Sequence, residues 1–151
     1  MMTYSAEQII SQLDKRKGGY FYIKLDADII NQFEQKKKTR LICTLDNKLT
    51  IRCGLNHLGD GHFYIILSKK NLELIHKKLG DTVHLHIKED PDPLGVDIPK
   101  VLEILLEQDE VIKQKFNQLT LGKRRSIIYQ INRIKNIDKQ IERCSQLILS
   151  S

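Results

Sequence analysis

A turn followed by an alternating strand, at residues 79–87, constrains the fold of this chain more than any other stretch. Gly80 and Asp81 are typical of a tight turn, and Val83, Leu85 and Ile87 alternate with polar residues after it. Alternating apolar residues share one face of a strand, and that face needs a core to pack against. Segments before this strand have the pattern of strands, and segments after it have the pattern of helices. We therefore expect it to complete a sheet that the earlier strands begin.

Four earlier segments have the residue pattern of strands, at 19–25, 40–45, 49–53 and 62–67. Short helices are expected at 26–33 and, after a Ser68 cap, at 69–79. Five short strands with brief helices between them predict a small, closed or half-closed, five-stranded β-barrel at residues 19–90. Residues 1–18 are expected to be an N-terminal leader, with a short helix at 5–16 that Ser5 caps.

A proline-rich acidic stretch marks the end of the predicted barrel. Residues 88–95 hold two of the three prolines and cannot continue a strand, so we expect a linker at 91–98. After Pro99, which suits the first position of a helix, apolar residues recur at helical spacing. Residues 99–151 are expected to form a tail of three or four helices, with Asp109 and Thr120 as caps. The predicted fold class is α+β.

Charge and cysteine content exclude several classes of protein. The 151 residues carry 25 basic and 19 acidic side chains, a formal charge of +6, and no tryptophan. No apolar run approaches the roughly 20 residues of a membrane span, so no membrane partner is expected. The N-terminus lacks a basic segment followed by an apolar core, so we expect no secretion signal. Three cysteines without a C-x-x-C pair predict reduced thiols and a cytoplasmic protein.

The tail contains a series of motifs that is similar to a known family. The series consists of Gly95-Val96-Asp97-Ile98-Pro99-Lys100-Val101-Leu102, Phe116-Asn117-Gln118-Leu119-Thr120, Lys123-Arg124-Arg125, and Ile131 with Lys135. It resembles the helical tail of the YdeI/OmpD-associated family. The chain departs from the family pattern at Gln130, where tryptophan is usual. Lys139 and Gln140 replace a Thr-Arg pair, although Arg143 is retained.

The earlier part of the chain resembles the small bacterial barrel domain of unknown function that often precedes this tail. The matching residues are Gly80, Asp81 and Val83 in the last strand, then Asp90, Gly95 and Pro99 in the linker. The resemblance covers residues 19–150 and implies a barrel related to the AbrB-type swapped-hairpin and double-split barrels. It implies no established activity, because the family names mention bacteriocin protection and a porin without describing a reaction.

No catalytic, cofactor-binding or metal-binding residue is expected. His84 and His86 share one strand face, and they would bind a transition metal only if His62 or a carboxylate joined them. A solvated pair is the favoured interpretation. Cys43 and Cys53 fall in phase with inward-facing apolar residues, which predicts buried, inert thiols. The acidic residues at 89–97 lie in the linker and are expected to be solvated.

The candidate binding residues are basic side chains of the tail: Lys123, Arg124, Arg125, Arg133 and Lys135. The first three lie in the first turns of a predicted helix, where cations oppose the helix dipole. They are therefore expected to have partners, either the acidic stretch 89–97 or an external anion. A second basic run, at 36–38, is expected to be a solvated helix end, with a phosphate-binding patch as the alternative.

The leading hypothesis is a cytoplasmic, non-enzymatic binding or adaptor protein with a protein partner and no cofactor. The alternative is a regulatory protein that binds nucleic acid through its basic tail, since phosphate neutralisation by basic residues drives such binding. A metal site at His84 and His86 is a third and weaker idea. The oligomeric state is left open.

Overall fold

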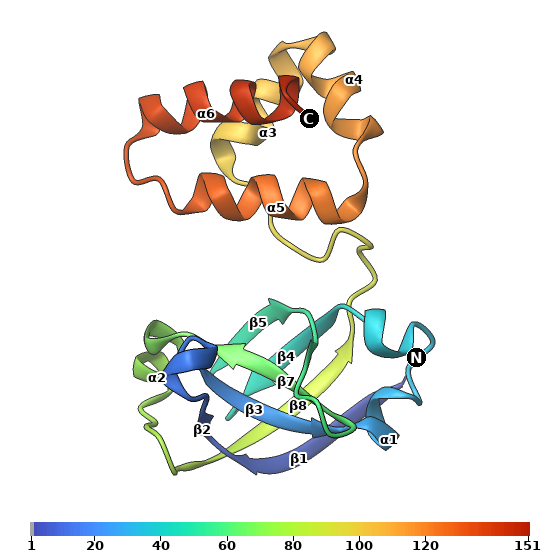
Figure 1. Cartoon of the computed structure of the whole chain (residues 1–151), viewed down its shortest axis with the longest axis vertical. Helices are drawn as coiled ribbons and strands as arrows, with labels where there is room; N and C mark the ends of the chain where they lie inside the picture. The colour runs from blue at the N-terminus through green and yellow to red at the C-terminus, as the bar shows by residue number, and fades with distance from the viewer. Residues whose placement is uncertain (1) are drawn as a thin grey trace. The chain divides into compact units, whose positions relative to one another are not determined.

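The structure, a computed structural model, describes residues 2–151 and divides the chain into two compact units, Met1–Gly95 and Val96–Ser151. The strands of the described residues all belong to the first unit, and the second unit is helical (Figure 1). This arrangement confirms the predicted α+β class and the order of a strand-rich part followed by helices. No helix formed by residues 2–151 is both long enough and apolar enough to cross a membrane.

The first sheet of the first unit contains four antiparallel strands. Its order is β1 (Thr3–Ile9), β8 (Thr82–Glu89), β4 (Leu41–Leu45) and β5 (Leu49–Cys53). β8 lies between β1 and β4, and its register pairs Leu85 with both Ala6 and Leu45. The strand that begins at the Gly80–Asp81 turn is therefore a central strand with a neighbour on each edge.

The second sheet is also antiparallel and contains β2 (Ser11–Gln12), β3 (Phe21–Asp26), β7 (His62–Leu67) and β6 (Asn56–His57), in that order. Short helical segments connect the strands: η1 (Lys15–Lys17), α1 (Ala27–Ile30), η2 (Lys36–Lys38) and α2 (Lys69–Ile75). Ser68 caps α2 as predicted, by accepting a hydrogen bond from the Asn71 amide at 3.0 Å. α2 ends earlier than predicted because His76 adopts a left-handed conformation.

The core of the first unit lies between these elements and consists of aliphatic and aromatic side chains. Its fully buried members include Ile10, Ile23, Leu25, Ile65, Val83, Leu85 and Ile87. The alternation of Val83, Leu85 and Ile87 therefore places them in the core, as the sequence predicts. Leu72 and Ile75 of α2 also belong to the core, so this short helix is held by tertiary packing.

The predicted N-terminal helix is wrong, because residues Thr3–Ile9 form strand β1. The side chains of β1 alternate between exposed and half-buried positions, and all seven residues pair with β8. The spacing of Ile9, Ile10 and Leu13 fits a helix as well as a strand, so the local pattern was ambiguous. Residues Thr3–Ile9 form a strand because they hydrogen-bond to β8, which lies more than seventy positions later in the chain.

The number of strands also differs from the prediction. The described residues contain eight strands in two hydrogen-bonded sheets, where we expected five strands in one barrel. Only Ile10 separates β1 from β2, and only Gly54 and Leu55 separate β5 from β6. The outermost strand at each edge of the first sheet therefore continues almost directly into an outermost strand of the second.

The second unit contains four helices: α3 (Lys100–Gln108), α4 (Glu110–Gln118), α5 (Leu121–Asn132) and α6 (Ile137–Leu149). Asp109 and Thr120 cap α4 and α5 through their side chains, as predicted, and Asn136 caps α6. The buried residues of these helices are Leu102, Ile112, Phe116, Ile127, Ile128, Ile131, Cys144 and Ile148. The apolar spacing that predicted the helices thus supplies their shared core.

Candidate functional site

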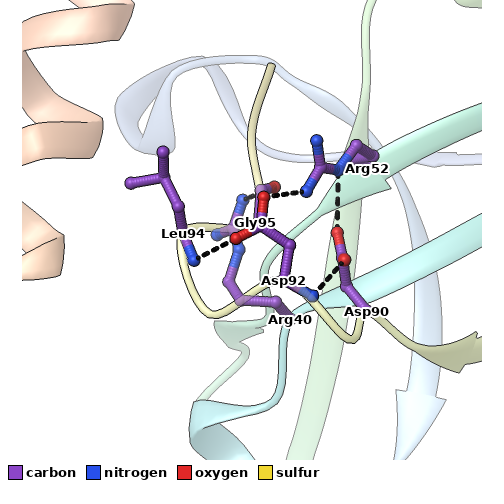
Figure 2. A network of polar contacts seen from close by, with 6 residues as sticks. All are labelled: Arg40, Arg52, Asp90, Asp92, Leu94 and Gly95. Atoms are coloured by element: carbon purple, nitrogen blue, oxygen red, sulfur yellow. Dashed lines mark hydrogen bonds and ion pairs between the residues drawn. The ribbon is translucent and has the colours of Figure 1, made fainter. Parts of the chain in front are cut away.

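A group of polar contacts lies where the first unit ends, between β5 and residues 90–95 (Figure 2). Arg52 of β5 donates hydrogen bonds through Nε to Asp90 Oδ2 and through a terminal nitrogen to Asp92 Oδ2, each at 2.8 Å. The Asp90 side chain is 2% exposed, whereas those of Arg52 and Asp92 are 25% and 48% exposed. One arginine therefore pairs with two carboxylates, and one of them is buried.

The two aspartates also accept hydrogen bonds from the backbone amides that follow them. Asp90 Oδ1 accepts a hydrogen bond from the Asp92 amide at 2.9 Å, and Asp92 Oδ1 accepts one from the Leu94 amide at 3.0 Å. The hydrogen bond from Arg52 holds the pKa of the Asp92 carboxyl below its usual value. Side chains that accept backbone N–H groups two residues later form Asx turns, which suit a stretch that contains two prolines.

Arg40 completes this group from the residue before β4. It donates a hydrogen bond to the Gly95 carbonyl at 3.1 Å, and its own carbonyl accepts one from the Asp90 amide at 2.8 Å. Gly95 has a φ of 67°, and a Cβ there would lie 2.6 Å from Arg40 Nε. Only glycine fits this close approach. We call Arg40, Arg52, Asp90, Asp92 and Gly95 the exit network.

The exit network corrects two expectations about the acidic stretch. Asp90 is buried, not solvated, and Arg52 of the first unit binds Asp90 and Asp92. Arg40 and Arg52 were not predicted as site residues, because neither belongs to a motif. The available signal was one arginine on each of two paired strand segments, ahead of a stretch with several carboxylates.

Arg124, the central residue of the predicted basic triplet, binds the end of the preceding helix. Its side chain donates hydrogen bonds to the Leu119 carbonyl at 3.1 Å and to the Asn117 carbonyl, and its guanidinium lies 5.8 Å from the centre of the Phe116 ring. These carbonyls are at the negative C-terminal end of α4, which a cation stabilises. Arg124 therefore has an internal partner, but it is the end of the preceding helix, which was not among the expected partners.

The other predicted residues do not gather around Arg124. Lys123, Arg133 and Lys135 are exposed, and Arg125 is half-buried. Lys123 lies in the first turn of α5 and Arg133 caps its other end, about 15 Å away along the axis at 1.5 Å per residue. Residues 36–38 form the exposed helix η2 in the first unit. The basic residues of the tail are therefore spread along α5 and the turn that follows it.

The histidines lie in different sheets and have polar neighbours. His86 of β8 shares a hydrogen bond of 2.7 Å with the Ser5 hydroxyl. His62 of β7 lies 2.8 Å from Asp60 and 3.3 Å from Asp26, and its hydrogen bond lowers the pKa of Asp60. β8 pairs with β1 and β4, so His62 does not join the histidines of β8. In residues 2–151 no three histidine, cysteine or acidic side chains form a group that could hold a metal ion.

Of the two cysteines predicted to be buried, Cys43 is buried and Cys53 is only partly so. Cys43 is fully buried in β4, and Cys53 is half-buried in the neighbouring strand β5. Burial raises the pKa of the Cys43 thiol to about 12 and also raises the pKa of the Cys53 thiol. A nucleophilic cysteine needs its thiolate form, so these two residues are poor nucleophiles at neutral pH.

Comparison with known protein families gives two matches that follow each other along the chain. Residues 8–87 match the model described as a domain of unknown function (DUF1905). Residues 95–150 match the model described as bacteriocin-protection, YdeI or OmpD-associated. No curated protein matches the chain.

Proposed function

This chain belongs to the DUF1905 family and carries a YdeI or OmpD-associated domain after it, and on this basis we propose that it is a non-enzymatic protein that binds a protein partner. The family descriptions name associations and no reaction. The state of the polar groups supports the same conclusion. Asp90 and Asp92 are both paired with Arg52, and the thiols of Cys43 and Cys53 are protonated at neutral pH.

The observation that carries this proposal is an apolar stripe on α6 that extends beyond the core. Ile137, Ile141, Cys144 and Ile148 follow each other at intervals of four, three and four residues and share one face of the helix. Cys144 and Ile148 are fully buried, whereas Ile137 is 63% and Ile141 is 45% exposed. A partner that covers the first half of the stripe would remove this apolar surface from water.

Two basic residues lie next to the exposed end of the stripe. Arg133 and Lys135 precede Ile137 in the turn before α6, with exposed side chains. Lys139 and Arg143 are also exposed, but each lies two residues from Ile141 and therefore on the opposite face of α6. We call Ile137 and Ile141, with Arg133 and Lys135, the α6 surface. An apolar surface with cations beside it suits a protein partner with acidic residues at the matching edge.

The test compares the partners of matched variants of the full chain by quantitative cross-linking in cells. Ile137→Ser with Ile141→Ser should remove a cross-linked protein that the wild-type chain retains, and Arg133→Glu with Lys135→Glu should weaken the same contact. Ile104→Ser is the control, because Ile104 is 42% exposed on α3. Equal partner profiles for all variants would contradict the α6 surface. A catalytic turnover lost on changing His84 or His86 would contradict the non-enzymatic role.

Nucleic-acid binding through the tail is the second candidate, supported by the exposed cations Lys123, Arg133 and Lys135. Arg124 is not counted among them, because two of its nitrogens donate to carbonyls at the end of α4. Binding by counterion release weakens steeply with salt. A gel-retardation assay at low and moderate salt separates the two candidates, and no retardation at low salt excludes the second one.

Two further expectations belong to this proposal. Free thiols at Cys43, Cys53 and Cys144 suit a reducing compartment, so we place the protein in the cytoplasm. We also infer that the two sheets of the first unit close into one barrel-like wall. If β1 with β2, and β5 with β6, each count as one bent strand, every strand has two neighbours and the wall has six strands.

A further inference from the structure

The first unit has one end at which exposed apolar side chains and basic residues occur together. The strand registers define this end: Ile9 pairs with Thr82, Leu45 with Leu49, and Phe21 with Leu67. η1, α2 and the turn from His76 to Asp81 connect strands here. Figure 1 shows α2 at this end and α1 at the other. β8 begins at this end, and the chain leaves the first unit from the other one.

The large hydrophobic side chains that are exposed on the described part of the first unit all lie at this end. The large hydrophobic side chains that are exposed among residues 2–95 are Ile9, Tyr20, Leu74 and Leu79, at 50–58%. Ile9 ends β1, Tyr20 precedes β3, and Leu74 lies on the outer side of α2 while Leu72 and Ile75 face the core. The Gly80 amide donates to the Ile10 carbonyl at 2.9 Å, which brings the segment of Leu79 beside that of Ile9.

Positive charge is concentrated at the same end. Eight basic residues lie there, at positions 15–17, 48, 69–70 and 77–78, against four acidic residues, at positions 14, 46, 73 and 81. Three of these carboxylates accept hydrogen bonds from backbone amides: Asp14 from Arg16, Asp46 from His84, and Asp81 from Lys78. At the opposite end, six basic residues at 36–38, 40, 52 and 88 face seven acidic residues at 26, 28, 34, 60, 89, 90 and 92. The charge of the first unit is therefore polarised.

We propose that this end of the first unit, which we call the α2 surface, binds the surface of an anionic lipid bilayer. The α2 surface consists of Ile9, Tyr20, Leu74 and Leu79 with the basic residues of η1 and α2. Aliphatic side chains enter the boundary between headgroups and acyl chains, and lysine and arginine attract anionic headgroups. The expectation of no membrane partner concerned a spanning segment, and a surface contact needs none.

The composition of the α2 surface favours lipid over nucleic acid. Single-stranded nucleic acid is bound by basic grooves in which aromatic side chains stack on bases. Three of the four exposed apolar side chains are aliphatic and only Tyr20 is aromatic. Isoleucine and leucine gain most from an apolar solvent, which the acyl region provides and a phosphate backbone does not. The surface is on the first unit, so the proposal does not depend on the α6 surface.

The test measures sedimentation of the full chain with vesicles of phosphatidylcholine, with and without phosphatidylglycerol. The wild-type chain should bind only the anionic vesicles, and added salt should weaken binding because it screens the headgroups. Each basic residue near an anionic surface raises the partition coefficient on the order of fivefold. Changing Lys15, Arg16 and Lys17 of η1 to Gln should therefore lower binding roughly a hundredfold. Leu74→Ser with Leu79→Ser should lower it at least about tenfold.

The chain offers a matched control, because η2 is also an exposed 3-10 helix of three basic residues. Changing Lys36, Lys37 and Lys38 to Gln removes the same charge at the opposite end and should leave binding within roughly a factor of two, since charges beyond a Debye length are screened. Circular dichroism confirms that each variant is folded. The proposal is overturned by equal losses in the two Gln variants, by equal binding to neutral vesicles, or by no vesicle binding. Binding to a single-stranded oligonucleotide in place of vesicles, lost on Tyr20→Ala, would assign the surface to nucleic acid instead.

Discussion

Asp90 is a buried charged residue whose partner is distant in sequence, so local sequence patterns did not predict its burial. It is one of two buried polar side chains in the described part of the chain. A buried carboxylate is tolerated only when it is paired and hydrogen-bonded, and Asp90 has both Arg52 and the Asp92 amide. Asp92, two residues later, shares the same arginine but remains half-exposed. The two positions therefore differ in burial and not in chemistry.

Replacing these two aspartates separately should measure that difference. Asp90→Ala leaves Arg52 without its buried partner and should lower the free energy of unfolding by about 2 kcal/mol. Asp92→Ala removes a pair that water screens and should cost less than about 1 kcal/mol. Urea unfolding followed by circular dichroism gives both values. Equal costs would mean that Asp90 gains nothing from its burial.

The reactivity of the three cysteine thiols gives a second prediction about single residues. Burial raises the pKa of Cys43 to about 12 and that of Cys144 to about 11, and it also raises the pKa of Cys53. At pH 8 all three should be protonated and should react with a thiol reagent much more slowly than free cysteine does. In denaturant, three thiols per chain should react at once. Fast labelling of the native protein at pH 8 would contradict the burial of these residues.

At the scale of elements, the junction between α4 and α5 explains an arrangement that looked unfavourable in sequence. Three cations in the first turns of α5 oppose the dipole of that helix. Arg124, however, lies beside the C-terminal carbonyls of α4, where its charge is favourable. A sequence pattern identifies the helix that a residue belongs to, but not the neighbouring helix end that its side chain reaches.

Single substitutions in the triplet should separate these two effects. Arg124→Ala should lower the free energy of unfolding of the helices by about 1–2 kcal/mol, because it removes hydrogen bonds to two carbonyls and the contact with Phe116. Lys123→Ala should change it by less than about 0.5 kcal/mol, since Lys123 is exposed. Thermal unfolding followed at 222 nm compares the variants. A larger cost at Lys123 would contradict the role of Arg124 at the end of α4.

β1 forms where a helix was predicted, and its backbone provides a direct test of the strand. Its residues pair with β8 from Thr3 to Ile9. Proline at Ala6 removes an amide and fixes φ in the middle of this ladder, so Ala6→Pro should lower the free energy of unfolding by about 1–3 kcal/mol. Thr3→Pro is the control, since Thr3 lies at the end of the ladder and should tolerate proline better. Asn47, in the turn between β4 and β5, does not serve as a control site because its φ is positive and proline cannot adopt it. Equal melting temperatures for Ala6→Pro and the wild type would contradict the pairing of β1 with β8.

For the whole molecule, sequence patterns correctly predicted the features that depend on the local spacing of apolar residues and on helix-capping residues. The alternation of Val83, Leu85 and Ile87, the caps Ser68, Asp109 and Thr120, and the change from strands to helices are all confirmed. The patterns failed where the partner is distant: Tyr4 and Ala6 depend on Ile87 and Leu85, and Asp90 depends on Arg52. Such contacts are set by topology, which one sequence does not reveal. The basic triplet was correctly placed in the first turns of a helix, whereas Arg133 and Lys135 were expected within the same helix and follow its end at Asn132.

The division into two units predicts how fragments 1–95 and 96–151 fold on their own. The main apolar cluster of the first unit runs from Ile10 to Ile87, so all its members lie within residues 1–95. A fragment 1–95 should therefore keep its β-sheet spectrum and unfold cooperatively. Residues 96–151 form a much shorter chain, and small units bury a smaller fraction of their surface, so this fragment should be the less stable of the two. Separate expression and thermal unfolding of the two fragments test both statements. An unfolded 1–95 fragment would mean that its core needs the helices, and the cost of Asp90→Ala would then have to be attributed to the whole chain.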